Sequence, residues 1–276
     1  MKIAINAWAI PAAVSFQELF ASLSAVGFDG VELNLDKEGA SAHALTFSTE
    51  SSQLNEIVSL SRQAGLPICS ISTSLYGSAQ LGSSDAEERQ RGQAVLRKQL
   101  DFARALGADT ILVVPGGISD CVSRVEAYQL ALDTLTDMKP EIEASGIRVG
   151  LENVWNSFFL SPVEMRNFID QLASKAIGAY FDVGNVAIFS YPEHWIEMLG
   201  QRIFKIHIKD FKRPSSWFQG HFVNLYEGTI DWQRVMDGLR AVGYDDWLTA
   251  ELSIMKQNPE LLYRTTHEAM RTMVSR

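Results

Sequence analysis

Short apolar runs alternate with longer segments of helical period along the whole chain. A short apolar run predicts a buried strand, and apolar residues three or four positions apart predict an amphipathic helix. The predicted strands are 2–8, 30–33, 67–73, 110–114, 149–152, 179–182, 203–208 and 247–251. The predicted helices are 16–26, 49–64, 85–106, 123–144, 161–172, 231–242 and 259–273. With a helix predicted after every strand except the sixth, we interpret this order as eight successive βα units.

Two of these helices begin with the residue pattern of a capping box. Asp85 is followed three residues later by Glu88, and Ser161 by Glu164, with Pro162 at the first helical position. In this pattern the first side chain accepts a hydrogen bond from the backbone N–H of the acid, and the carboxylate of the acid accepts one from the backbone N–H of the first residue. The pattern predicts that helices begin directly after Asp85 and Ser161.

Strict alternation of strand and helix favours a parallel sheet covered by helices. The 276 residues are close to the roughly 250 typical of a (β/α)8 barrel, and we expect residues 1–276 to form one such TIM barrel domain. The main rival is an open doubly wound sheet, but no G-x-G-x-x-G motif follows the first strand. Irregular stretches at 36–48, 74–84 and 211–228 follow strands, on the side where such barrels place their active sites.

Charge and cysteine content exclude several classes of protein. The formal net charge of −9 opposes broad binding to nucleic acid or to an anionic membrane. Two cysteines, Cys69 and Cys121, form no CxxC pair, so we expect neither disulfides nor a thiolate metal site, in keeping with the cytoplasm. The start of the chain resembles a strand and not a signal peptide, and no apolar run is long enough to span a bilayer.

Four predicted strands carry a metal-ligand type of side chain at or near their ends: Glu152, Asp182, His207 and Glu251. A barrel gathers these strand ends around one axis, where three carboxylates would repel one another unless a divalent cation lay between them. Oxygen ligands with one imidazole suit Mn, Mg, Co or Fe, and Zn is a further candidate. The alternative for each residue alone is an ordinary polar strand end.

Lys205 presents a difficulty for this arrangement. Strand alternation puts it on the same side as His207 and deeper in the barrel, where an unpaired ammonium would be costly. Either an acid pairs with Lys205, or a local bulge interrupts the alternation.

Several segments resemble the xylose-isomerase-like sugar phosphate isomerase/epimerase family. They are LENVWN at 151–156, YFDVGN at 180–185, IHIKD at 206–210 and AEL at 250–252, with further likeness at 81–85 and 228–232. Within the family the likeness is closer to hexulose-phosphate isomerases and L-ribulose-5-phosphate 3-epimerases than to D-tagatose 3-epimerase. The resemblance implies that Glu152, Asp182, His207 and Glu251 bind the metal. It also implies a sugar contact for Arg213, and it places Asn185 where ketose epimerases carry a substrate-contacting histidine.

A site of this kind favours proton abstraction beside a carbonyl, through an enediolate. Two glutamates would serve as base and acid, and we expect Glu152 and Glu251 to take these roles on a sugar or sugar phosphate. Glu32 is expected either to bind a substrate hydroxyl or to pair with a cation inside the barrel. Further residues that could contact substrate are Lys209 and Arg213, with Lys212 as a weaker candidate for a phosphate, together with His221, Glu227, Trp8 and Trp155. The oligomeric state is open, although related barrels often pair.

Three other functions remain open for such a chain. A lyase resembling inosose dehydratase would use the same metal and expel a hydroxyl. An abasic-site endonuclease would need further histidines, but Asn185 and Lys212 stand at two of those positions. A non-catalytic sugar-binding protein would have no need of the complete ligand set.

Overall fold

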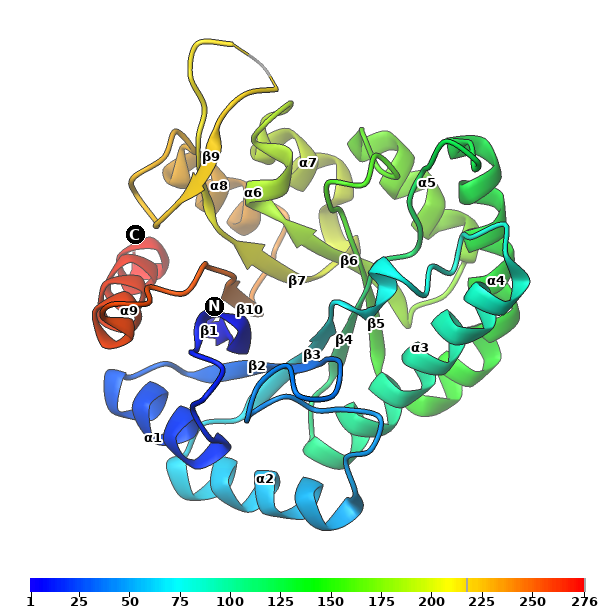
Figure 1. Ribbon diagram of the computed structural model, residues 1–276. Coiled ribbons are helices and arrows are strands. Elements are labelled where there is room, and N and C mark those ends of the chain that lie inside the picture. Colours follow the sequence, from blue (N-terminus) through cyan, green and yellow to red (C-terminus); the bar gives the residue numbers. More distant parts are fainter. Residues whose placement is uncertain (217, 276) are drawn as a thin grey trace.

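The strands form a closed barrel in the order β1-β10-β7-β6-β5-β4-β3-β2, surrounded by helices (Figure 1). The computed structural model describes residues 1–216 and 218–275. The barrel strands are β1 (Lys2–Asn6), β2 (Gly30–Leu35), β3 (Ile68–Thr73), β4 (Thr110–Val113), β5 (Arg148–Glu152), β6 (Ile177–Asp182), β7 (Ile203–Ile208) and β10 (Trp247–Ala250). All neighbouring barrel strands pair in parallel, so the predicted (β/α)8 architecture is confirmed.

The first and last strands of the barrel close the ring, because β1 pairs with β10 in the register Lys2↔Trp247. The first strand is shorter than predicted. It ends at Asn6, whose side chain accepts a hydrogen bond from the backbone of Trp8 and caps a 3₁₀ turn over Ala7–Ala9. Trp8 therefore lies at the mouth of the barrel, and its indole donates to Asp36 Oδ2 at 2.8 Å.

The helices are α1 (Phe16–Val26), α2 (Ser51–Ala64), α3 (Ala86–Leu106), α4 (Arg124–Ser145), α5 (Pro162–Leu172), α6 (Val183–Val186), α7 (Pro192–Leu199), α8 (Trp232–Ala241) and α9 (Pro259–Ser275). The capping box predicted at Ser161 is confirmed. Asp85 does cap α3, but Glu88 instead accepts hydrogen bonds from Gln80 and Ser83 in the preceding loop. No helix of the described residues combines the length and the apolar content that crossing a membrane requires.

Lys205 is fully buried and pairs with acids, which is one of the two arrangements expected for it. Its ammonium lies 2.8 Å from Asp246 Oδ1 and 3.0 Å from Asp109 Oδ1. The pairing of β6 with β7 also shifts register between Ala179 and Tyr180, before Lys205 is reached. The two acids offset the cost of burying the charge.

The segment after β7 folds over the barrel mouth as a small hairpin that the sequence analysis did not predict. In it β8 (Asp210–Lys212) pairs antiparallel with β9 (His221–Val223). Asp210 is fully buried and accepts hydrogen bonds from the backbone of Tyr226, Gly228 and Ile230. Because Asp210 binds these amides, it fixes the loop that follows the hairpin.

Candidate metal and substrate site

Four side chains from different strands meet at the carboxyl end of the barrel. Glu152 and Asp182 close β5 and β6, His207 lies in β7, and Glu251 follows β10 directly. One ligand atom from each lies within 4.8 Å of every other, so the structure brings together the four residues that the sequence singled out.

Burial gives these carboxylates unusual acidities. It raises the pKa of Glu152 to about 7, an effect to which the nearby charges of Glu251 and Asp182 add. Burial also raises the pKa of Asp182. Burial acts in the same direction on Glu251, but the ammonium of Lys209 and the imidazole of His207 together outweigh it and hold the pKa of Glu251 below its usual range. The site therefore concentrates negative charge where water cannot screen it.

The donor atoms fit a divalent cation. Asp182 Oδ2 is buried and receives no hydrogen bond of good geometry from any described residue, although Lys209 Nζ lies 2.9 Å away as an ion pair. Carboxylate oxygens with one imidazole nitrogen are the ligand set that Mn²⁺, Mg²⁺, Co²⁺ or Zn²⁺ accepts. A cation among these atoms would give Asp182 Oδ2 a bonding partner besides Lys209 and reduce the repulsion between the carboxylates.

The ring of His207 is oriented by contacts on both of its nitrogens. Nε2 lies 2.6 Å from Glu32 Oε1, on the side away from the cluster. Nδ1 lies 3.1 Å from Glu152 Oε1 and 3.3 Å from Glu251 Oε2. The lone pair available for a metal is therefore expected on Nδ1, with the proton on Nε2.

Glu32 is fully buried and surrounded by hydrogen-bond donors. Besides His207, its carboxylate accepts from Asn6 Nδ2, Ser70 Oγ and Tyr180 OH, each at 2.6 Å. Burial acts to raise its pKa, but His207 and these donors lower it. With both oxygens occupied inside the barrel, Glu32 has no atom left for a substrate hydroxyl. The structure therefore gives no support to a substrate contact by Glu32, and in place of the expected barrel cation it puts Glu32 against His207 and three neutral donors.

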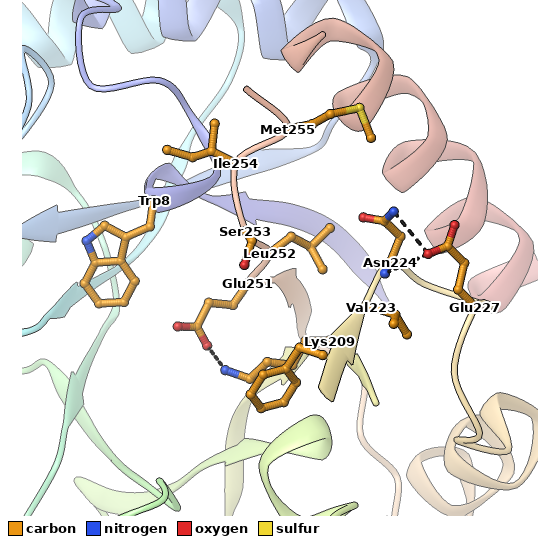
Figure 2. A pocket seen from close by; sticks show the side chains of 11 residues that line it. Trp8, Lys209, Val223, Asn224, Glu227, Glu251, Leu252, Ser253, Ile254 and Met255 are labelled. Atoms are coloured by element: carbon orange, nitrogen blue, oxygen red, sulfur yellow. Dashed lines mark hydrogen bonds and ion pairs between the residues drawn. The ribbon is translucent and has the colours of Figure 1, made fainter. Parts of the chain in front are cut away.

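A cavity of about 490 Å³ adjoins the cluster, and Glu251 belongs to both (Figure 2). Figure 2 shows Glu251 meeting Lys209 at the base of this cavity, with Trp8 and Ile254 on one side and Asn224 on the other. Its lining is formed by Trp8, Lys209, Phe222, Val223, Asn224, Glu227, Glu251, Leu252, Ser253, Ile254 and Met255. A ligand in the cavity would lie beside the carboxylate cluster.

Lys209 and Glu227, two of the predicted substrate contacts, line this cavity. Lys209 is held between Asp182 and Glu251. Burial acts to lower the pKa of Lys209, but the nearby carboxylates outweigh it and raise that pKa above the usual value. Glu227 accepts from the side chain of Asn224 at 3.2 Å. The sequence analysis did not single out Asn224 or the apolar wall 252–255, because both lie in irregular segments without a periodic pattern.

Asn185, Trp155 and Arg213 lie outside the cavity lining. Asn185 donates its backbone N–H to Asp182 Oδ1 at 2.7 Å and so supports that carboxylate. Trp155 donates to the backbone oxygen of Asn185 and stacks on Phe222, with ring centroids 4.7 Å apart.

The guanidinium of Arg213 donates to Ala187 O at 3.0 Å and lies over the ring of Tyr191. This placement, beside α6 and α7, gives no support to a substrate contact by Arg213. Its predicted role rested on the resemblance and on its position after the seventh strand, and neither fixes the direction of the side chain.

Known proteins resemble this chain over most of its length. The putative L-ribulose-5-phosphate 3-epimerase SgbU of Escherichia coli K12 is 25% identical over 84% of this chain and 81% of its own. The chain matches 60% of the length of an uncharacterized protein, MJ1311, of Methanocaldococcus jannaschii.

Solved structures share the fold. A structure of L-ribulose 3-epimerase matches with a TM-score of 0.81 and 18% identity, over 99% of this chain and 94% of its own. A structure of IOLI protein with a zinc atom matches with a TM-score of 0.82 and 16% identity, over 100% of this chain and 98% of its own. Finally, a family model described as "Xylose isomerase-like TIM barrel" matches residues 20–273. Since this match covers almost the whole chain, the protein belongs to the xylose isomerase-like TIM barrel family.

Proposed function

We propose that the protein is a divalent-metal-dependent isomerase or epimerase of a ketose or ketose phosphate. The observation that carries the proposal is the convergence of Glu152, Asp182, His207 and Glu251 beside a cavity of sugar size. The family membership and the epimerase names of the relatives support it.

In this proposal the four side chains hold one cation, of which Mn²⁺, Mg²⁺ and Co²⁺ suit the donors best. When bound, the cation would supply Lewis-acid stabilisation of the negative charge that develops on a substrate oxygen. Asn185 keeps Asp182 in place through its backbone N–H, and Glu32 does the same for the imidazole of His207.

Proton transfer is assigned to Glu152 and Glu251. They arise from β5 and from the end of β10, with β6 and β7 between them in the barrel. An epimerase removes a proton from one face of the substrate carbon and returns one to the other face, so two carboxylates from separate strands suit the reaction. An enediolate would form between the two steps, and Lys209 beside Glu251 provides positive charge at the edge of the cavity.

The proposal is tested by incubating the metal-loaded protein with a panel of ketoses and ketose phosphates in D₂O. We expect deuterium to enter C1 or C3 of at least one of them, detected by NMR or mass spectrometry. Exchange at C3 would indicate epimerisation, and exchange at C1 would indicate isomerisation. Loss of water from the sugar without exchange would show a dehydratase instead, and no reaction with any member of the panel would contradict the proposal.

Substitution Glu32→Gln is expected to weaken metal binding by about 10- to 100-fold, the usual effect of losing an outer-shell partner of a histidine ligand. All contacts of the Glu32 carboxylate are donors, so the amide nitrogen of glutamine would face donors and release the ring of His207. The measurement is the dissociation constant for Mn²⁺ or Co²⁺.

Ser72→Ala provides the matched control, because Ser72 accepts from Asn6 in the same buried network without touching His207. Thermal unfolding of both variants would show whether they remain folded. Equal metal affinity in Glu32→Gln and the wild type would remove Glu32 from its positioning role.

A further inference from the structure

The cavity beside Glu251 has an unfavourable charge pattern for a phosphate group. Among its described lining residues Lys209 is the one cation, and two acids, Glu227 and Glu251, accompany it. The ammonium of Lys209 already lies against Asp182 and Glu251, so its charge is matched before any ligand enters. Beyond the carboxylate cluster with its proposed cation and Lys209, the described lining adds one acid, Glu227, and no further cation for an incoming dianion, on a chain whose overall charge is −9.

Lys212 and Arg213, the other cations considered for a phosphate, do not line the cavity. Lys212 is exposed on β8 and pairs in register with His221 on β9. The guanidinium of Arg213 is engaged beside α6 and α7, with Ala187 O and the ring of Tyr191. Of the cations that the sequence placed after β7, only Lys209 belongs to the described lining of the cavity.

The backbone donors after β7 are also occupied. Phosphate sites in βα barrels are often formed by the loops after the seventh and eighth strands. Here the amides of Tyr226, Gly228 and Ile230 donate to Asp210, with N···O distances of 3.0, 3.2 and 3.4 Å, and the indole of Trp232 donates to it at 2.9 Å. A carboxylate of the chain itself thus binds the donors that a phosphate would need.

In the loop after β10 a backbone donor is likewise occupied by a side chain of the protein itself, at the end of the loop where helix α9 begins. Helix α9 begins at Pro259, and Asn258 Oδ1 accepts from the backbone of Leu261 at 3.1 Å, so a side chain already caps this helix start. Between Glu251 and Asn258 the cavity wall is mainly apolar, because Leu252, Ile254 and Met255 belong to its lining. Burying a phosphate against such a wall would remove its water, and among the described wall residues 252–255 only Ser253 has a side chain that could donate a hydrogen bond in return.

We propose that the cavity accepts a neutral ketose, whose end remote from the carboxylate cluster carries no phosphate. Asn224 and Ser253 offer an amide and a hydroxyl of the kind that binds sugar hydroxyls, and the indole of Trp8 offers a flat apolar face. This inference rests on the proposed function, and it separates this chain from relatives named for L-ribulose 5-phosphate.

The test compares L-ribulose with L-ribulose 5-phosphate as substrates of the metal-loaded protein, with deuterium exchange as the readout. We expect kcat/KM to be at least about tenfold higher for the neutral sugar. A kcat/KM that is equal or higher for the phosphate ester would overturn the inference and leave the proposed function standing.

A binding measurement shows whether the cavity binds phosphate even if neither sugar reacts. Inorganic phosphate is titrated by calorimetry into the metal-free and the metal-loaded protein, which separates phosphate held by the cation from phosphate held by the wall. We expect no saturation of the metal-free protein below about 10 mM, roughly −3 kcal/mol on the usual affinity scale. Saturable binding of phosphate to the metal-free protein below about 1 mM would overturn the inference. Failure of every ketose to react would count against the proposed function alone.

Discussion

Replacement of either Glu152 or Glu251 by glutamine is expected to lower the rate of deuterium exchange into the substrate by at least about 10³-fold. Each carboxylate has two roles in the proposal, as a ligand of the cation and as a group that exchanges a proton with carbon. Glutamine keeps the shape of the side chain, but it cannot take up a proton at neutral pH. The measurement is exchange by the purified variants at saturating metal, so that weakened metal binding is separated from lost proton transfer.

Glu56→Gln is a suitable control for these variants, because Glu56 is an exposed acid on α2. It makes the same chemical change far from the cluster and should leave exchange unaltered. If both Glu152→Gln and Glu251→Gln retained full exchange, their assignment as acid and base would be wrong.

Removal of divalent metal is expected to have an effect of similar size. Without a cation the three carboxylates repel one another, and the charge that develops on the substrate oxygen has no electrophile beside it. Exhaustive chelation followed by removal of the chelator should lower the exchange rate by about 10³-fold or more. Addition of one equivalent of Mn²⁺, Mg²⁺ or Co²⁺ should restore the rate, and the order of effectiveness would identify the preferred ion.

Recovery of activity distinguishes metal dependence from damage. Circular dichroism before and after chelation would show whether the barrel stays folded, and restoration by added metal excludes irreversible loss. Full activity in a sample shown by elemental analysis to contain no metal would contradict the prediction.

The barrel and the carboxylate cluster could be predicted from the sequence for the same physical reason. Strands buried on both faces appear as short apolar runs, and a polar residue that ends such a run stands where the strands meet. Glu152 and Asp182 carried this signal strongly. Lys205 and His207, two positions apart in the seventh predicted strand, showed the same pattern. In the structure Lys205 forms a buried ion pair with Asp246, whereas His207 belongs to the cluster.

Depth within the barrel could not be predicted. Glu32 was expected near the end of the second strand, but that strand continues to Leu35, and Glu32 lies on the far side of His207 from the cluster. Its depth depends on the register between strands, which shifts between Val31 and Glu32 in the pairing of β2 with β3. A sequence pattern specifies which face of a strand a residue occupies, and register then decides which layer it joins.

Loop geometry was the second feature beyond the reach of the sequence pattern. The hairpin of β8 and β9 and the wall at 252–255 have no periodic signal, and their positions depend on single contacts such as those of Asp210. Arg213 illustrates the consequence, since its place after β7 was predicted correctly but its direction depends on Ala187 and Tyr191.

The most direct test of the account is a titration of the metal-free protein with Mn²⁺, in which electron paramagnetic resonance follows the free ion. We predict one ion bound per chain in the wild type. In Asp182→Ala the affinity should fall by more than the roughly 10- to 100-fold expected of an outer-shell contact. Stoichiometric binding of Mn²⁺ to Asp182→Ala with unchanged affinity, or no binding to the wild type, would show that these side chains do not form a metal site.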